Sequence, residues 1–406
     1  MLIVKPLDIN RKIRVISSLF LASIMVLSTA ISSDNSQQIY QGSEPCQVIS
    51  ELQFNGTKAN QSISWQTGLG YRLPGSDASA ELRQSVTENL TQWSFTESSH
   101  EREDFTLTNL VGSYSPENTS GQNIIFVAHY DSRFIADRDA NESNRDQPIL
   151  GANDGASGVA VLIELGRIIP SLEINHDVTL FFTDAEDQGQ PFKADTWSYG
   201  ADAWVSNLTS DYKENISAYI VIDMIGDTFL DFTRVTSTSD TLWETITPIA
   251  AALGMIDGEL DCNGNNGLSI YDPDPNKERG VIDDHVAAHN AGIPAINLID
   301  INYGENASAF GGHWHTQSDT PDKVSSQSLT YIGHILEVGL RTSAWTLVDH
   351  IVDEEGTNQT GNSNLQSDDS VNLDDVSKSN LVGYLAIIVV STILLLILVA
   401  DISVKR

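Results

Sequence analysis

The chain is poor in cysteine and in basic residues. Its 406 residues include two cysteines, and 22 Lys and Arg stand against 55 Asp and Glu, which gives a formal net charge of −33 at pH 7. Two cysteines exclude a disulfide framework and a cysteine-based zinc site. An oxidising compartment permits one bridge between Cys46 and Cys262, and the sequence leaves that pairing open. A chain this acidic disfavours nucleic acid or anionic lipid as a partner and is typical of a well-solvated, salt-adapted surface.

Two long apolar segments lie near the ends of the chain. The first, Val15 to Ile31, follows a basic stretch, Arg11 to Arg14, and finishes in small residues, which is the layout of a secretory signal peptide. A retained N-terminal anchor is the alternative. The second, Leu381 to Ala400, carries no charge and is long enough to cross a bilayer, and Lys405-Arg406 follow it. The excess of positive charge on the inner side predicts a cytoplasmic tail and an external body.

These features predict a single-pass protein of the cell membrane with one extracellular globular domain. An α/β domain of about 300 residues can form a single core. The segment before the membrane helix is rich in Ser, Asn, Asp and Gln, so we expect a flexible stalk. The predicted parts are a signal peptide or anchor at 1–32, a globular domain at 33–352, a stalk at 353–380, a transmembrane helix at 381–400 and a cytoplasmic tail at 401–406.

Within the globular domain, short apolar runs alternate with amphipathic segments. This alternation predicts a three-layer α/β/α sandwich with a mixed, mainly parallel sheet. A polar stretch without periodicity, Asp131 to Gln147, is expected to be a surface loop or lid. We expect strands at about 106–112, 123–130, 178–183, 218–223 and 295–299, and helices at about 78–93, after 158, at 197–208, at 241–253, after 284 and at 325–350.

Several of the predicted strands end in residues that can bind a metal. The candidate ligands are His129, Asp154, Asp187, Asp223 and His315. Imidazole and carboxylate groups are the ligands that zinc takes when no thiolate is present. Asp154 lies in a glycine-flanked loop at a helix N-terminus and is placed to bridge two metals. Glu186, next to a candidate ligand, is placed to transfer protons. Each residue alone is more often explained by an ordinary hydrogen bond, a turn or a cap, and it is their convergence on several strand ends that indicates a metal.

Five motifs follow one another along the chain. They are Val127-Ala-His-Tyr-Asp-Ser132, Gly151-Ala-Asn-Asp-Gly-Ala-Ser-Gly158, Asp184-Ala-Glu-Asp187, Ile222-Asp-Met-Ile-Gly226, and His315-Thr316 with Asp319-Thr320. In this order they resemble the M28 family of zinc aminopeptidases. The resemblance covers about residues 63 to 349 and implies a phosphorylase/hydrolase-like fold of the zinc aminopeptidase type, so that 33–352 is expected to be an M28-like zinc-dependent catalytic domain.

Three further segments narrow the resemblance within that group: Trp197-Ser198-Tyr199-Gly200, the Asp283-Asp284-His285 stretch that leads to Gly292-Ile293-Pro294, and Trp314-His315-Thr316. By these segments the sequence resembles the glutaminyl-peptide cyclotransferases, or glutaminyl cyclases, more than other members. The resemblance implies that Asp154, Asp187 and His315 hold one zinc ion and that Glu186 is the acid/base. It further implies that Asp223 and Asp284 complete a polar pocket and that Trp314 contacts the substrate.

Other features depart from the cyclase pattern and leave the activity open. Asp187 stands where the family usually has Glu, Ala156-Ser157-Gly158 after Asp154 is of the aminopeptidase type, and Phe192 replaces an expected Trp. Every ligand of a two-metal site is also present, with His129 and Asp223 beside one metal and Asp187 and His315 beside the other. We therefore expect a zinc-dependent cyclase that acts on the N-termini of peptides or proteins. A di-zinc aminopeptidase and an inactive peptide-binding ectodomain are the alternatives, and the sequence leaves the oligomeric state open.

Overall fold

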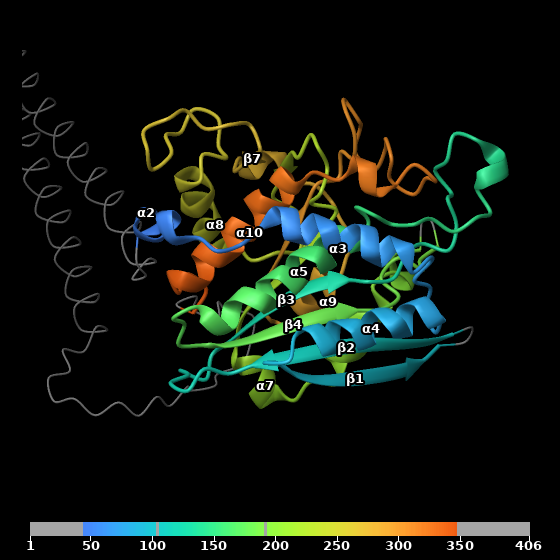
Figure 1. The fold of residues 1–406 in the computed structure, drawn as a ribbon, viewed down its shortest axis with the longest axis horizontal. Coiled ribbons are helices and arrows are strands. Elements are labelled where there is room, and N and C mark those ends of the chain that lie inside the picture. The colour runs from blue at the N-terminus through green and yellow to red at the C-terminus, as the bar shows by residue number, and fades with distance from the viewer. Residues whose placement is uncertain (1–43, 103–104, 191–192, 347–406) are drawn as a thin grey trace, which may run out of the picture. The chain divides into compact units, whose positions relative to one another are not determined.

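A six-stranded sheet with helices on both faces forms the centre of the protein (Figure 1). The computed structural model describes residues 44–102, 105–190 and 193–346. Strands β4, β3, β5 and β8 are parallel to one another, and β2 runs antiparallel to both β1 and β4. The predicted fold class is confirmed. The strands are β1 Ser94–Glu101, β2 Thr106–Tyr114, β3 Asn123–His129, β4 Asp177–Thr183, β5 Ile216–Asp223 and β8 Ala295–Ile299, in the spatial order β1-β2-β4-β3-β5-β8.

The central strands are apolar along their length and polar at their carboxyl ends. Every residue of β3 and of β5 is buried, as expected for parallel strands covered on both faces. The last residue of β3, His129, pairs in register with Thr183 at the end of β4. The last residue of β5, Asp223, pairs with Ile299 at the end of β8. The four parallel strands therefore end along one edge of the sheet, where open α/β folds keep their sites.

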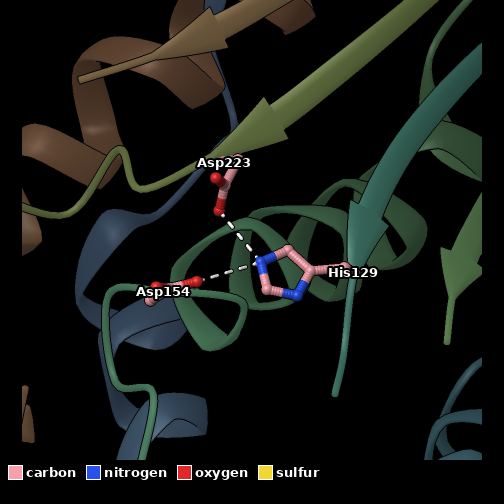
Figure 2. Close-up of side chains that lie close together, drawn as sticks. All are labelled: His129, Asp154 and Asp223. Carbon is pink, nitrogen blue, oxygen red and sulfur yellow. Dashed lines mark hydrogen bonds and ion pairs between the residues drawn. The ribbon is translucent and has the colours of Figure 1, made fainter. Parts of the chain in front are cut away.

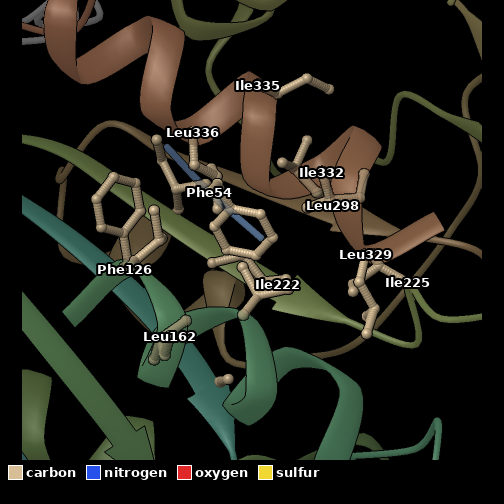
Figure 3. Packing of buried hydrophobic residues seen from close by; sticks show 14 of the residues in the cluster. Phe54, Phe126, Leu162, Ile222, Ile225, Leu298, Leu329, Ile332, Ile335 and Leu336 are labelled. Carbon is tan, nitrogen blue, oxygen red and sulfur yellow. The ribbon is translucent and has the colours of Figure 1, made fainter. Parts of the chain in front are cut away.

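The larger hydrophobic core lies between the sheet and one layer of helices. Leu298 and Ile222 from the strands meet Ile332 and Leu336 from the last helix (Figure 3). Phe54 packs so closely on Gly333 that a Cβ at this glycine would lie 2.2 Å from the ring. The helices that contribute to this core are α3 Gly56–Gly68, α4 Asp77–Asn89, α5 Ala156–Ile168, α8 Asp240–Ala252 and α10 Ser326–Arg341.

The opposite face of the sheet is covered by shorter helices around a smaller core. Phe181 and Tyr219 from the strands pack there with Trp204 and Ala288. The helices are α6 Tyr199–Ser206, α7 Ser210–Glu214 and α9 His285–Asn290. The remaining elements are α2 Pro45–Val48, the two-stranded sheet of β6 Phe232–Thr233 and β7 Tyr271–Asp272, and the 3-10 turns η1 Ile49–Glu51, η2 Glu142–Asn144, η3 Ile169–Ser171, η4 Ala194–Thr196, η5 Pro275–Lys277 and η6 Pro321–Lys323.

The structure corrects several predicted boundaries. Helix α4 ends at Asn89 rather than near residue 93, because the chain turns into β1. Helix α10 ends at Arg341 rather than near residue 350, and Ser343 in the following turns has a positive φ of 54°. The polar strand β1 and the weakly amphipathic helix α3 were not predicted, since neither has a clear apolar period.

The predicted signal segment, stalk, transmembrane helix and tail lie outside the described residues and remain predictions. Among the residues that the structure describes, no helix is both long and apolar enough to cross a membrane.

The two cysteines form a disulfide. Cys46 in α2 is bonded to Cys262 in the loop after α8, and 216 positions of sequence separate them. The bond fastens the first described helix to the segment that follows α8. It also fits the exported location that the sequence predicts, because disulfides persist in oxidising compartments.

Replacing both cysteines by serine, in Cys46→Ser/Cys262→Ser, should lower the free energy of unfolding by about 2–4 kcal/mol, since the bridge closes a long loop and restricts the unfolded chain. Urea unfolding of the protein measures this loss. Reduction of the unaltered protein should give the same loss, and an unchanged midpoint in both experiments would contradict a stabilising bridge.

A second prediction concerns His176, which is fully buried just before β4. Neither of its ring nitrogens has a hydrogen-bond partner in the described part of the chain. Burial lowers the pKa of His176 to about 4, below its ordinary value of 6.5. The unfolded chain therefore binds this proton at a higher pH than the folded chain does. The contribution of neutral, buried His176 to the free energy of unfolding is therefore complete above about pH 6.5, and it is lost as the pH falls towards 4.

The variant His176→Gln should remove this dependence. Between pH 7 and pH 4 the variant should lose less stability than the unaltered protein. The difference should be on the order of 3 kcal/mol, which is the free-energy equivalent of the lowered pKa of His176. Urea unfolding at several pH values measures the difference. The exposed His289→Gln is the control, and equal slopes for all three proteins would contradict the assignment.

Candidate metal centre and active site

Five predicted ligands lie together at the carboxyl edge of the sheet. His129 and Asp223 end β3 and β5, and Asp187 follows β4. Asp154 comes from the loop before α5, and His315 comes from the long segment between β8 and α10. All five side chains are buried, with no more than 6% of any residue exposed. Their convergence is therefore a property of the fold and not of one flexible loop.

Three of the ligands form a first group, which consists of His129, Asp154 and Asp223 (Figure 2). The Nε2 atom of His129 lies 3.1 Å from Oδ1 of Asp223 and 3.3 Å from Oδ1 of Asp154. The candidate ligand atoms of the group all lie within 4.8 Å of one another. One cation can be held between such atoms.

A second group consists of Asp154, Asp187 and His315 and satisfies the same criterion. The Nε2 atom of His315 lies 3.1 Å from Oδ1 of Asp187 and 3.7 Å from Oδ2 of Asp154. Asp154 is thus shared, with Oδ1 towards the first group and Oδ2 towards the second. This arrangement is suited to a carboxylate that bridges two metals.

Two buried oxygens in the second group have no hydrogen-bond partner among the described residues. They are Oδ2 of Asp154 and Oδ2 of Asp187. A buried carboxylate oxygen without a partner is costly, and a cation relieves that cost. With His315 they provide the oxygen and nitrogen donors that zinc binds in sites without cysteine. The residues of this group therefore fit a zinc ion.

Asp131 holds the acidic loop in place. Its Oδ1 accepts the backbone N–H of Glu186 at 3.0 Å, and its Oδ2 accepts that of Asp187 at 3.1 Å. The same Oδ1 lies 3.4 Å from Nδ1 of His129. One buried carboxylate thus orients residues from two strand ends, as partners of metal ligands commonly do.

Asp319 has the same function for the loop of Asp154. Its two oxygens accept the backbone N–H groups of Asn153 at 2.8 Å and of Asp154 at 3.2 Å, and Oδ1 also accepts the hydroxyl of Tyr303 at 2.7 Å. Gly155, next in the chain, has a φ of +90°, and a Cβ there would lie 2.9 Å from His129. Asp154 is therefore fixed by both the hydrogen bonds and the close packing of its loop.

Glu186 lies beside the two groups without belonging to either. Its side chain accepts a hydrogen bond from the Ser198 hydroxyl at 3.1 Å, and 7% of the residue is exposed. Ala185 before it has a positive φ of 57°, which turns the chain sharply after β4. Burial raises the pKa of Glu186 well above its ordinary value, and the charge of Asp283 adds to this effect. An acid/base group of this kind is expected next to a metal.

Asp284 is also buried close to Glu186. Its Oδ2 accepts the Thr183 hydroxyl at 2.5 Å, and its Oδ1 has no partner in the described residues. Burial raises its pKa well above the ordinary value, and the adjacent Asp283 raises it further. The side-chain amide of Asn297 donates to Oδ2 of Asp283 at 2.6 Å, so this neighbouring carboxylate is already hydrogen-bonded within the protein.

Neighbouring carboxylates change the pKa values of the two histidines, and burial changes that of Asp223. Burial opposes protonation of His129, but Asp223 and the neighbouring carboxylates raise its pKa well above 6.5. Burial also opposes protonation of His315, whose pKa is nevertheless raised by Asp187. Burial raises the pKa of Asp223 to about 7. The edge of the sheet thus collects more negative charge than its protein cations neutralise.

Aromatic rings cover the second group. The ring of Trp314 stacks on His315, with ring centres 3.6 Å apart, and Trp197 stacks on the same histidine at 6.1 Å. Phe310 packs against Trp314 at 4.9 Å. The predicted substrate contact, Trp314, is therefore next to a candidate metal ligand. Phe192, also considered from the sequence, lies outside the described residues.

The polar stretch 131–147 is not simply a surface loop. Its first three residues are buried, and Asp131 and Arg133 contact the site directly. Farther along, the backbone N–H of Arg138 donates to the carbonyl of His315 at 3.2 Å. The supporting roles of Asp131, Arg133 and Asp319 were not predicted, although Asp131 and Asp319 lie within the motifs. The available signal for Asp131 and Arg133 was their position two and four residues after His129, which ends a strand.

Comparisons with known proteins agree with this site. The model of peptidase family M28 matches residues 109–338. Among characterised sequences, aminopeptidase YwaD of Bacillus subtilis is 24% identical over 238 residues, a match that covers 57% of this chain and 43% of YwaD. A probable zinc metalloprotease of Leptosphaeria maculans is 27% identical over 262 residues and is covered to 55%. The chain thus spans about half the length of these two relatives.

Solved structures of both activities are similar over most of their length. The glutaminyl cyclase of Bacteroides thetaiotaomicron bound to N-acetylhistamine has a TM-score of 0.62 and 26% identity, covering 71% of this chain and 98% of the cyclase. A leucine aminopeptidase precursor from the same organism has a TM-score of 0.61 with the same identity and coverage. The glutaminyl cyclase of Porphyromonas gingivalis has 28% identity and a TM-score of 0.60, covering 70% and 96%. The match to the family model and the two groups of candidate metal ligands support the same conclusion: the chain belongs to peptidase family M28.

Proposed function

We propose that the protein is a zinc-dependent glutaminyl-peptide cyclotransferase, which converts an N-terminal glutamine of a peptide to pyroglutamate with release of ammonia. The observation that supports this best is the unequal state of the two ligand groups. In both groups the histidine Nε2 contacts two carboxylates. The buried ligand oxygens that lack a hydrogen-bond partner among the described residues are Oδ2 of Asp154 and Oδ2 of Asp187, and both residues belong to the second group. The oxygens that a cation would satisfy are thus concentrated at one position, which supports one zinc.

A zinc ion in the second group would act as a Lewis acid on the γ-amide carbonyl of the glutamine. Glu186 would accept a proton from the substrate α-amine and return it to the departing ammonia. Its hydrogen bond from Ser198 fixes one carboxylate oxygen and leaves the other for this transfer. A single residue thus serves both proton transfers.

The surroundings of Glu186 suit an uncharged attacking amine. Trp314 and Trp197, both stacked on His315, provide apolar walls that limit the access of water. Asp284, whose pKa is raised, can donate a hydrogen bond to negative charge that develops on the substrate. Asp223 completes the polar side of the pocket.

A di-zinc aminopeptidase is the second candidate, and one observation favours it. The two oxygens of Asp154 face different ligand groups, as a bridging carboxylate does. In that case the same Glu186 would activate a water molecule for attack on the first peptide bond. The cyclase and the aminopeptidase thus differ in the attacking group and in the number of zinc ions.

The proposed substrates are the N-termini of peptides or proteins outside the cell. The predicted signal segment and C-terminal membrane helix would place the catalytic domain on the external side of the cell membrane. The disulfide between Cys46 and Cys262 supports an oxidising location.

The variant Glu186→Gln should lower turnover by about 10²–10⁴-fold, the usual contribution of a general acid/base, while zinc content and folding stay unchanged. The assay offers glutamine β-naphthylamide, followed by mass spectrometry for loss of ammonia, and leucine amide, followed for free leucine. The exposed Glu142→Gln is the matched control. Ammonia loss that depends on Glu186 supports the cyclase. Free leucine as the main product contradicts it, and full turnover by Glu186→Gln would show that Glu186 is not the base.

Ligand variants test the number of zinc ions. If one zinc lies in the second group, His315→Gln should weaken zinc binding by more than about 100-fold, since loss of a direct ligand costs more than loss of an outer partner. His129→Gln should keep one zinc per chain, because glutamine can still donate a hydrogen bond to Asp223. Elemental analysis after dialysis gives the metal content. Two zincs in the unaltered protein, with one lost in each variant, would support the aminopeptidase instead.

A further inference from the structure

Arg133 is a fully buried cation that contacts the second ligand group. Its Nη1 donates to the backbone carbonyl of Asp187 at 3.0 Å and to Oδ1 of the same residue at 3.1 Å. Its Nη2 donates to the carbonyl of Gly189 at 3.2 Å, and its Nε donates to Oδ1 of Asp137 at 2.8 Å. Every nitrogen of the guanidinium is thus used within the protein.

The same arginine reaches His315 through Asp137. The Oδ1 atom of Asp137 lies 3.1 Å from Nδ1 of His315, which leaves Nε2 directed towards Asp187 and Asp154. The ring of Trp197, which stacks on His315, also lies over the guanidinium at 4.8 Å. Arg133 therefore supports two of the three residues of the second group.

The first group has no such support. In the described part of the chain, neither Asp154 nor Asp223 forms an ion pair with an arginine or a lysine, and Nδ1 of His129 faces only the carboxylate of Asp131. Buried Arg72 donates to the backbone carbonyls of Tyr130 and Gly151, which lie near His129 and Asp154, but among the described residues an arginine donates directly to a ligand side chain only in the second group. The two groups therefore differ in how their ligand side chains are held.

We propose that Arg133 is a positioning residue that makes Asp187 a one-oxygen metal ligand and thereby sets the zinc affinity of the second group. The arginine donates to Oδ1 of Asp187 and to the backbone carbonyls of Asp187 and Gly189, so Oδ2 remains for the metal. Aspartate is one methylene shorter than glutamate, a reach of about 1.5 Å, and the fixed backbone compensates for it. The proposal rests on the proposed zinc site but not on which reaction the site performs.

The geometry also predicts the sign of the effect. As a nearby positive charge, Arg133 repels a divalent cation, so its removal would tighten zinc binding if charge alone mattered. As a positioning residue it has the opposite influence, and its removal weakens binding. Lysine keeps the charge but offers a single nitrogen, which cannot replace the fork that contacts Asp187, Gly189 and Asp137 together.

Zinc affinity measured by competition with a fluorescent chelator tests this proposal on the whole protein. Arg133→Lys and Arg133→Gln should bind zinc about 10–100-fold more weakly, as loss of an outer partner of a metal ligand usually does. Arg145→Gln, an exposed arginine of the same loop, is the control and should bind as the unaltered protein does. Binding by Arg133→Lys within about twofold of the unaltered protein, or tighter binding by Arg133→Gln, overturns the proposal.

A rescue variant separates positioning from a merely structural role. Adding Asp187→Glu to Arg133→Lys supplies the missing methylene and should recover at least about 10-fold in zinc affinity. Weakened binding without recovery overturns the proposal. If both arginine variants unfold, Asp137→Ala decides the question, because it keeps the buried arginine and removes the carboxylate that joins its Nε to Nδ1 of His315: about 10-fold weaker zinc binding supports the proposal, and unchanged binding overturns it.

The activity assay on the same samples keeps the two proposals separate. An unaltered protein that binds zinc but releases no ammonia from glutamine substrates contradicts the cyclase and leaves the zinc affinities of the Arg133 variants fully interpretable. Weak zinc binding confined to the Arg133 variants supports the positioning role under either activity.

Discussion

The structure depends on an excess of buried negative charge at the carboxyl edge of its sheet. Asp154, Asp187 and Asp223 converge there with Glu186 and two histidines, and burial raises the pKa values of Asp223 and Glu186. Without a cation, such a cluster must hold protons or lose stability. The surrounding residues keep the carboxylates in place despite this repulsion: Asp131 and Asp319 accept backbone N–H groups, and Arg133 donates to Asp187. The strand ends and loops thus hold these oxygens where a cation can neutralise them.

Much of the site was predictable because its residues follow apolar strands. His129 and Asp223 are the last residues of β3 and β5, and parallel strands bring such ends to one edge. The contacts that hold the ligands in place could not be predicted in the same way. Arg133 lies in a polar stretch whose composition indicates a surface loop, yet it is fully buried. Its burial follows from partners 54 to 56 positions away in the sequence, Asp187 and Gly189, and periodicity carries no information on such contacts.

The fold followed from the same strand signals, and its errors have clear physical causes. β1 is mostly exposed and polar, so it lacks the alternation that identifies a strand, and its pairing with β2 decides its conformation. Helix α10 stops at Arg341 although apolar residues continue, because Trp345 turns back to pack beneath Gly339. The disulfide between Cys46 and Cys262 depends on how α2 lies against the segment after α8, which sequence spacing does not encode. The local sequence pattern thus predicts the layers of the fold, whereas tertiary contacts determine where individual helices and strands end.

Solved structures similar to this chain include both glutaminyl cyclases and a leucine aminopeptidase precursor. The measurement that tests the central claim most directly is anomalous X-ray scattering at the zinc edge, from crystals of the protein grown with zinc. The account predicts a strong peak enclosed by Asp154, Asp187 and His315, with at most a weaker one beside His129. A peak elsewhere, or none at this edge of the sheet, would contradict the assignment of the buried carboxylates as metal ligands.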